Sequence, residues 1–181
     1  MKSKKVAFLG IMGALALVIG FLEHMLIPDI PFLPVGAKPG LSNVVTMYVA
    51  TVMGFPGAIY ITLIKALFAF LTRGATAFFM SFCGGFLSTA VTCIMLKAGK
   101  KYFSFWGIGM VSAVMHNMGQ LMAASFISGT LTLLNYGKYL LIFSLITGSV
   151  TGVVLLMTVP RVEKFSDSYK NNSKNKKEMK I

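Results

Sequence analysis

The stretch ATAFFMSFCGGFLSTAVTCIML, residues 75–96, followed by KAGKK, residues 97–101, shows the pattern that decides the fold. A run of about 20 apolar residues without a charge is long enough, as a helix, to cross the hydrocarbon core of a bilayer. Lysines gather directly after the run, as they do in loops that stay on the cytoplasmic side of a membrane. We therefore interpret residues 75–96 as a transmembrane helix that ends in the cytoplasm.

The same pattern extends over the chain, of which 56% is hydrophobic and only 12% is charged. Thirteen of the 17 Lys and Arg residues lie in three clusters: residues 2–5, residues 97–101 and residues 161–180. The apolar stretches are residues 6–27, 41–53, 58–72, 75–96, 105–127 and 139–159. Since loops rich in Lys and Arg stay inside, we predict an all-α integral membrane protein. Residues 1–160 form a bundle of six transmembrane helices, and both termini are cytoplasmic.

Two features of this topology depend on short or polar segments. Residues 41–53 rise only about 20 Å as a helix, less than the roughly 30 Å hydrocarbon core. A re-entrant hairpin formed by residues 41–53 and 58–72 gives the same sidedness as two crossings, so four helices plus a hairpin remain an alternative.

Residues 161–181 are rich in Lys, Asn and Ser, and we predict a basic disordered cytoplasmic tail. The net charge of +12 flanks apolar spans, which indicates anionic lipid headgroups rather than nucleic acid.

Four ionisable residues fall within the apolar stretches: Glu23, His24, Lys65 and His116. Ionisable side chains at membrane depth are costly and commonly mark functional sites. At 1.5 Å per residue, Glu23, Lys65 and Gln120 lie roughly 6–10 Å from the outer ends of their helices, so they can meet in one layer. Two interpretations stay open: Glu23 pairs with Lys65 inside the bundle, or the layer lines a substrate cavity that opens to the outside.

Two predicted helix starts offer positive charge near that layer. In VGAKPGLSN, residues 35–43, Pro39 suits the first turn of a helix, and the free N–H groups there would form an anion site beside Lys38. Arg73 precedes the start of the fourth span in the same way. Alternatively, Lys38 and Arg73 reach toward lipid headgroups. On the fifth span, residues 112, 116 and 120 form one polar stripe. The substrate-binding candidates are Glu23, Lys38, Asn43, Lys65, Arg73, His116, Asn117 and Gln120.

Several motifs are missing from the chain. Its five acidic residues form no clustered pair, so Mg²⁺-dependent diphosphate chemistry has no evident carboxylates to hold the metal. No G-x-x-x-x-G-K-[ST] motif and no Cys/His cluster with metal spacing occurs. We therefore expect no enzymatic activity, no metal and no cofactor.

Small residues recur four apart along several spans, a spacing that lets helix backbones approach closely. We assign most of them to packing within the bundle. In the first helix, Gly10 and Ala14 form a stripe that suits a partner helix, and we predict partner docking there.

The stretches KVAFLGIMGALAL (residues 5–17), FLE (residues 21–23) and GAKPGLSN (residues 36–43) resemble the Gx transporter family. Members of that family carry the label heptaprenyl diphosphate synthase component I. The family is similar to the substrate-binding S components of energy-coupling-factor (ECF) transporters, and the resemblance covers about residues 4–160.

The resemblance implies a six-helix bundle in the bacterial plasma membrane that captures a small vitamin- or cofactor-like molecule from outside. It also implies pairing with a transmembrane coupling subunit and two ATPases. S components dock through an Ala-x-x-x-Ala motif in the first helix, which Gly10-x-x-x-Ala14 matches with glycine at the first position. The excess of Lys and Arg in the outer half favours an anionic ligand. The alternative is a membrane accessory protein of prenyl diphosphate or quinone metabolism, or of extracellular electron-transfer assembly.

Overall fold

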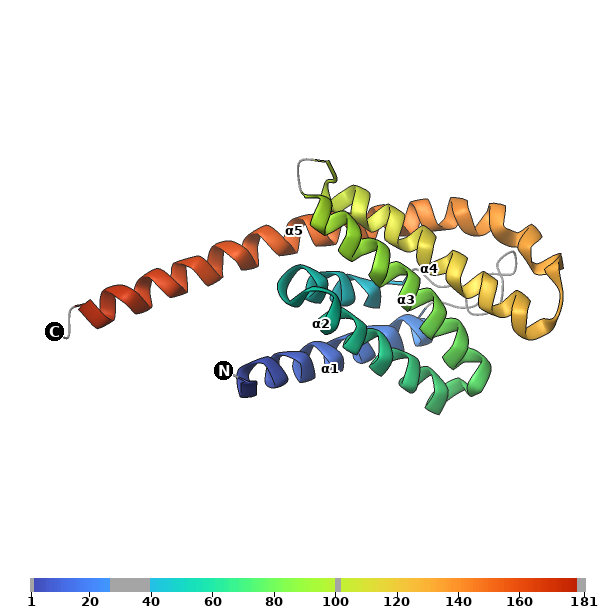
Figure 1. Cartoon of the computed structure of the whole chain (residues 1–181), viewed down its shortest axis with the longest axis horizontal. Coiled ribbons are helices and arrows are strands. Elements are labelled where there is room, and N and C mark those ends of the chain that lie inside the picture. The colour runs from blue at the N-terminus through green and yellow to red at the C-terminus, as the bar shows by residue number, and fades with distance from the viewer. Residues whose placement is uncertain (1, 27–39, 100–101, 179–181) are drawn as a thin grey trace.

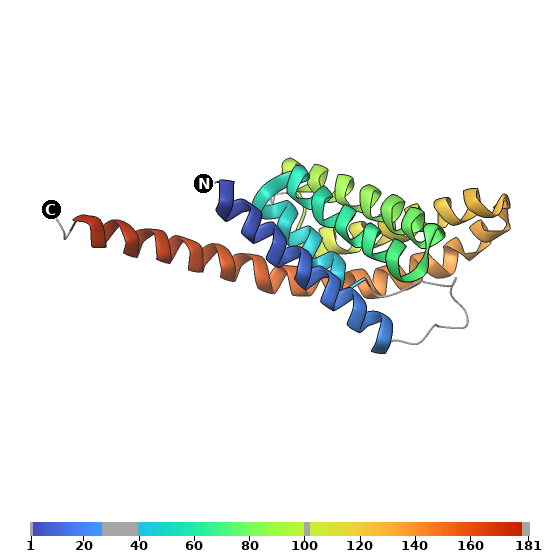
Figure 2. The same ribbon diagram turned by 90° about the horizontal axis from the view of Figure 1, so that it is seen from below.

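The computed structural model describes residues 2–26, 40–99 and 102–178, without the side chains of Lys2, His24, Leu26 and residues 162–178. Its elements are α1 Lys2–Leu26, α2 Ser42–Arg73, α3 Ala75–Ala98, α4 Phe105–Ser128, the 3₁₀ helix η1 Leu131–Tyr136 and α5 Gly137–Glu178. Over the described residues the prediction of an all-α protein is confirmed. The helices lie side by side in one bundle, and the last part of α5 projects beyond it (Figures 1 and 2).

Helix α2 turns back on itself at Gly54. This residue has φ 69° and ψ −162°, a combination that is open almost only to glycine because glycine lacks a Cβ. Pro56 follows and has no backbone N–H, so it cannot continue the hydrogen-bond ladder of the first arm. Ser42 and Arg73, at the two ends of α2, consequently lie at the same end of the bundle, where both line one cavity.

By length and apolar composition, four segments of the described chain can cross a membrane: Ser3–Glu23, Ser42–Arg73, Ala75–Ala98 and Leu131–Arg161. Large apolar side chains also cover the outside of the bundle, where Ile11 is 64% and Ile146 is 62% exposed. Such extensive exposed apolar surface is typical of contact with lipid. The chain is therefore a multi-pass membrane protein. The first arm of α2 is short, as predicted, and rises only about 18 Å.

Glycines allow α4 and α5 to touch backbone to backbone. A Cβ built on Gly109 would lie 2.3 Å from the Cα atom of Gly152, and a Cβ on Gly148 would lie 2.7 Å from the Cα atom of Met110. Real side chains do not tolerate such distances, so only glycine permits this approach. Small residues at helix interfaces are the usual means of tight packing in membranes, and this part of the predicted small-residue pattern packs within the bundle.

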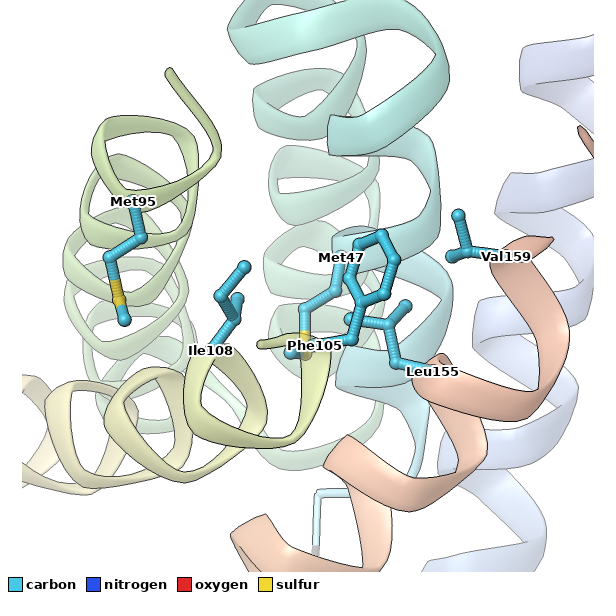
Figure 3. Close-up of a cluster of buried hydrophobic side chains, with 6 residues drawn as sticks. All are labelled: Met47, Met95, Phe105, Ile108, Leu155 and Val159. Carbon is cyan, nitrogen blue, oxygen red and sulfur yellow. The ribbon is translucent and has the colours of Figure 1, made fainter. Parts of the chain in front are cut away.

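A cluster of buried apolar side chains joins α2 to α3, α4 and α5 (Figure 3). Its members are Met47, Met95, Phe105, Ile108, Leu155 and Val159. Met95 lies near the end of α3 and Phe105 begins α4, so the cluster closes the end of the bundle opposite the two ends of α2.

The chain segments that carry the three basic clusters point toward one end of the bundle. The start of α1, the junction of α3 with α4 and the final part of α5 all face that way in both views (Figures 1 and 2). Residues 161–178 continue α5 as a helix to Glu178, which differs from the predicted disordered tail. The prediction rested on the Lys, Asn and Ser content of residues 161–181, and that these residues form a basic cytoplasmic tail stays a prediction.

Candidate functional site

A cavity of about 330 Å³ opens between α1, α2, α3 and α4 at the end of the bundle away from the basic clusters. This volume is at the lower end of the roughly 300–1,000 Å³ typical of small-molecule sites. Its lining consists of Ala16, Leu17, Gly20, Phe21, Glu23, Gly40, Ser42, Asn43, Lys65, Phe68, Thr72, Arg73, Ser81, His116 and Gln120. The layer that the helical rise predicted from Glu23, Lys65 and Gln120 is therefore part of one cavity wall.

Glu23 links the end of α1 to the start of α2. Its side chain is only 6% exposed, and its Oε1 atom accepts hydrogen bonds from the backbone N–H groups of Gly40 and of Leu41, the latter at 3.2 Å. The first N–H groups of a helix have no partner within it and attract negative charge. Glu23 therefore occupies N–H groups just before α2, where the sequence predicted an anion site beside Lys38.

Lys65 enters the cavity from the second arm of α2. Its Nζ atom donates a hydrogen bond of 2.6 Å to Oδ1 of Asn43, which lies in the first turn of the same helix. The reversal at Gly54 brings these two residues together although 22 positions separate them. Lys65 thus bonds to a neutral amide and Glu23 to the backbone, and Glu23 also acts on Lys65 electrostatically.

His116 and Gln120 reach the cavity because α3 and α4 are in close contact. A Cβ on Gly84 would lie 2.6 Å from the backbone oxygen of His116, and a Cβ on Gly119 would lie 2.8 Å from the Cα atom of Gly84. The Nδ1 atom of His116 is buried and has no hydrogen-bond partner among the described residues. A polar atom in this state commonly serves a ligand or an ordered water.

The rim of the cavity carries Arg73, which is exposed at the end of α2. The charged side chains on the described lining are therefore Glu23, Lys65 and Arg73. Thr72 and Ser81 also belong to the lining but were not predicted. Ser81 lies nearly two turns inside the fourth span, which is a signal for a site role, but its spacing of four from Gly85 is typical of helix packing.

Two predicted site residues lie elsewhere or outside the described chain. Asn117 is buried and donates a hydrogen bond of 2.7 Å from Nδ2 to Oγ of Ser144, so it joins α4 to α5 and is not part of the cavity lining. Ser112 of the polar stripe accepts from Thr92 of α3 at 3.0 Å. Lys38 lies outside the described residues, as does the side chain of His24.

The docking candidates Gly10 and Ala14 are exposed on α1, away from the cavity. No atom lies within 4 Å of a Cβ built on Gly10, whereas a Cβ on Gly13 would lie 3.3 Å from Cδ1 of Ile64 in α2. Helix α1 thus has one small-residue face against α2 and a second that is open.

The chemistry of the cavity is that of binding. Two cations and several neutral polar groups surround a space of small-molecule size, with one carboxylate held by backbone N–H groups. Within the described residues, no three His, Cys, Asp or Glu side chains gather in a way that could hold a metal ion. The arrangement suits an anionic molecule with further hydrogen-bonding groups.

Comparison with known proteins gives a single kind of match. No curated protein and no solved structure matches the chain. The model of one protein family, described as heptaprenyl diphosphate synthase component I, matches residues 12–158. This range includes every residue of the cavity lining, and the match confirms the resemblance drawn from the sequence. The chain belongs to the heptaprenyl diphosphate synthase component I family.

Proposed function

We propose that the chain is the substrate-binding subunit of an ECF-type importer in the bacterial plasma membrane. It captures a small anionic molecule, of the size of a vitamin or cofactor, from the outer face. Six helical segments cross the bilayer in this proposal, and both termini lie in the cytoplasm, as the positive-inside rule requires for the three basic clusters. Membership of a family of S-component-like membrane proteins supports this assignment.

The observation that carries the proposal is a lysine inside the bundle that faces a cavity. Lys65 is half-buried on the cavity wall, and an ionisable side chain at this depth commonly marks a functional site. Its Nζ atom donates to the neutral oxygen of Asn43. Arg73 adds a second positive charge at the rim. Glu23 acts on Lys65 electrostatically, but with Arg73 the lining carries two positive charges against one negative, and a carboxylate or phosphate from outside balances the excess.

Replacement of Lys65 tests the proposal. Native mass spectrometry of the purified protein is expected to show a retained acidic molecule, and Lys65→Met is expected to reduce its retention at least tenfold. A charge-assisted hydrogen bond contributes about 1.5–3 kcal/mol, which corresponds to roughly ten- to a hundredfold in affinity. Lys138→Met is the matched control, since Lys138 is exposed and lies over the ring of Tyr139 instead. Equal retention by the wild type and Lys65→Met, or none by the wild type, contradicts the proposal.

The coupling subunit and its two ATPases dock, in this proposal, on the open face of α1. Leucine at Ala14 would prevent close approach of another helix, where van der Waals contact supplies most of the association energy. Ala14→Leu is therefore expected to abolish co-purification of the partners while retention of the small molecule survives. Ala75→Leu, at an exposed position of α3, is the control. Loss of folding together with docking would show that Ala14 packs within the chain.

The family description favours one further candidate, a membrane accessory protein of prenyl diphosphate or quinone metabolism. That function needs a protein partner and no acidic ligand in the cavity. Under this alternative, the chain is expected to co-purify with a prenyltransferase or reductase. The Lys65→Met variant is then expected to support the activity of that partner in cells as well as the wild type does.

A further inference from the structure

Two adjacent glycines in α3, Gly84 and Gly85, hold α4 and α2 close against two sides of that helix. A Cβ built on Gly84 would lie 2.7 Å from Cγ of Gln120 in α4, and a Cβ on Gly85 would lie 2.6 Å from Cγ2 of Thr62 in α2. The hydroxyl groups of Thr62 and Thr89 of α3 also share a hydrogen bond of 2.9 Å. These contacts fix the positions of α2 and α4 at one level of the bundle.

Three polar side chains of the cavity wall lie at or just beyond that level. Lys65 follows Thr62 by three residues and Ser81 precedes Gly84 by three, so each lies about one helical turn nearer the cavity end of the bundle. Gln120 lies against Gly84 itself. All three side chains line the cavity. An ammonium group, a hydroxyl group and an amide therefore face one space from α2, α3 and α4.

The amide of Gln120 is free to bind a ligand. Neither Gln120 nor Ser81 makes a hydrogen bond to the part of the chain that the structure describes. Within that part, the unpaired side-chain polar atoms that are fully enclosed are Oγ1 of Thr46, Nδ1 of His116 and Oγ of Ser125. The amide atoms of half-buried Gln120 are not among them, so they are accessible from the cavity that Gln120 lines.

The chemistry of the amide defines the ligand group that pairs with it. The Gln120 side chain has a carbonyl acceptor and an NH₂ donor side by side. A ligand group with an adjacent donor and acceptor can bind both atoms at once, whichever way the amide is turned. Carboxamides, lactams and ureas have this pattern, whereas a ketone, an ester or an ether offers acceptors alone.

We propose that the molecule held in the cavity is an acid that also carries a carboxamide, lactam or urea group, and that this group pairs with the side-chain amide of Gln120 while Lys65 binds the acid. This inference rests on the proposed function and adds a specificity residue to it. An acid with a methyl ketone in place of the carboxamide leaves the Gln120 oxygen facing a methyl group. Such an acid binds roughly tenfold more weakly, because a desolvated acceptor is then left unpaired.

Two pairs of aromatic acids probe the amide directly: 3- and 4-carbamoylbenzoate, and 3- and 4-acetylbenzoate, in which a methyl group takes the place of NH₂. The anionic group and the size are closely matched within each pair. Binding to the full chain in detergent is measured by calorimetry. At least one carbamoyl acid is expected to bind about tenfold more tightly than its acetyl counterpart.

Two substitutions assign that preference to Gln120. Gln120→Met keeps an unbranched chain against Gly84 and removes the amide, so the affinity ratio within the pair is expected to fall to about one. Gln120→Glu keeps an acceptor for the NH₂ group, so the ratio is expected to persist although the added negative charge weakens both acids. Met122→Leu, at an exposed position of α4, is the control and is expected to leave both affinities unchanged.

The other outcomes separate this inference from the proposed function. If each pair binds equally to the wild type and Lys65→Met weakens both acids, the anion site stands and the pairing with Gln120 is refuted. A tenfold ratio that persists in Gln120→Met, or is lost in Gln120→Glu, also refutes the pairing. If none of the four acids binds at millimolar concentration, the anion cavity itself is refuted. Should Gln120→Met fail to fold, Gln120→Leu replaces it with the same expectation.

The molecule that the protein retains from cells gives an independent readout. The accurate mass of the acid released in native mass spectrometry gives its elemental composition. This acid is expected to contain nitrogen, and its retention is expected to fall about tenfold in Gln120→Met. A retained acid without nitrogen overturns the inference and leaves the proposed function standing.

Discussion

At the scale of single residues, Glu23 shows how a charge becomes tolerable inside this bundle. Its carboxylate accepts from the backbone N–H groups of Gly40 and Leu41, directly before α2, so the charge faces the positive end of a helix dipole. The same hydrogen bonds join the end of α1 to the start of α2, and Glu23 and Gly40 both belong to the cavity lining. Glu23 therefore connects the start of α2 to the cavity wall and also acts electrostatically on Lys65.

Two substitutions separate the contribution of the Glu23 charge from that of its hydrogen-bond acceptor oxygen. Glu23→Ala leaves the N–H groups of Gly40 and Leu41 without their acceptor, and we expect it to lower the free energy of unfolding by about 1–3 kcal/mol. Glu23→Gln keeps an acceptor oxygen and is expected to cost less than half as much. Equilibrium unfolding in mixed detergent micelles measures both. A Glu23→Ala variant as stable as the wild type would show that the contact contributes nothing.

At the scale of one element, the reversal of α2 depends on the backbone of Gly54. Alanine cannot adopt φ 69° with ψ −162° without strain of roughly 1–3 kcal/mol. We expect Gly54→Ala to lower stability by that amount and to weaken the contact of Lys65 with Asn43, because the two arms of α2 would no longer align. Thermal unfolding and retention of the acidic molecule are the measurements. An unchanged protein would mean that Pro56 alone sets the reversal.

The seam between α4 and α5 gives a matched pair of glycine substitutions. Gly109→Ala forces the helices apart, since its Cβ would meet backbone atoms of Gly152, and we expect a loss of about 1–3 kcal/mol, as in overpacked cores. Gly10→Ala meets open space and is expected to be neutral or to stabilise α1 by up to about 1 kcal/mol. The difference between the two unfolding free energies is the test. Equal effects would contradict the assigned packing.

At the scale of the whole molecule, the orientation can be measured by cysteine labelling. Cys83 and Cys93 are first replaced by serine and alanine, and single cysteines are then placed at Asn135 in η1 and at Lys170 in α5. A membrane-impermeant maleimide added to intact cells is expected to label position 135 only, because the basic segments stay inside. Labelling of position 170 without cell lysis would reverse the orientation.

Much of the architecture could be predicted from the sequence because hydropathy and Gly/Pro breaks are local signals. The reversal near Gly54 and the common depth of Glu23, Lys65 and Gln120 follow from residue spacing alone. The partner of Glu23 could not be predicted, since it lies across a proline-rich segment that carries no periodicity. The side chain of Asn117 points to α5 and not into the cavity because of how α4 is rotated about its own axis. The close contacts at the glycines of α4 determine that rotation.

The turn at Gly54 also bears on how the chain enters the membrane during synthesis. The first arm of α2, about 12 residues from Ser42 to Met53, is too short to be held across a hydrocarbon core of roughly 30 Å on its own. Its polar ends would also meet lipid without the second arm beside them. We therefore expect the two arms to leave the translocon together as a helical hairpin, once Arg73 has emerged from the ribosome. The start of α2 then reaches Glu23, already in place on α1, in the same step that brings Lys65 into the bundle.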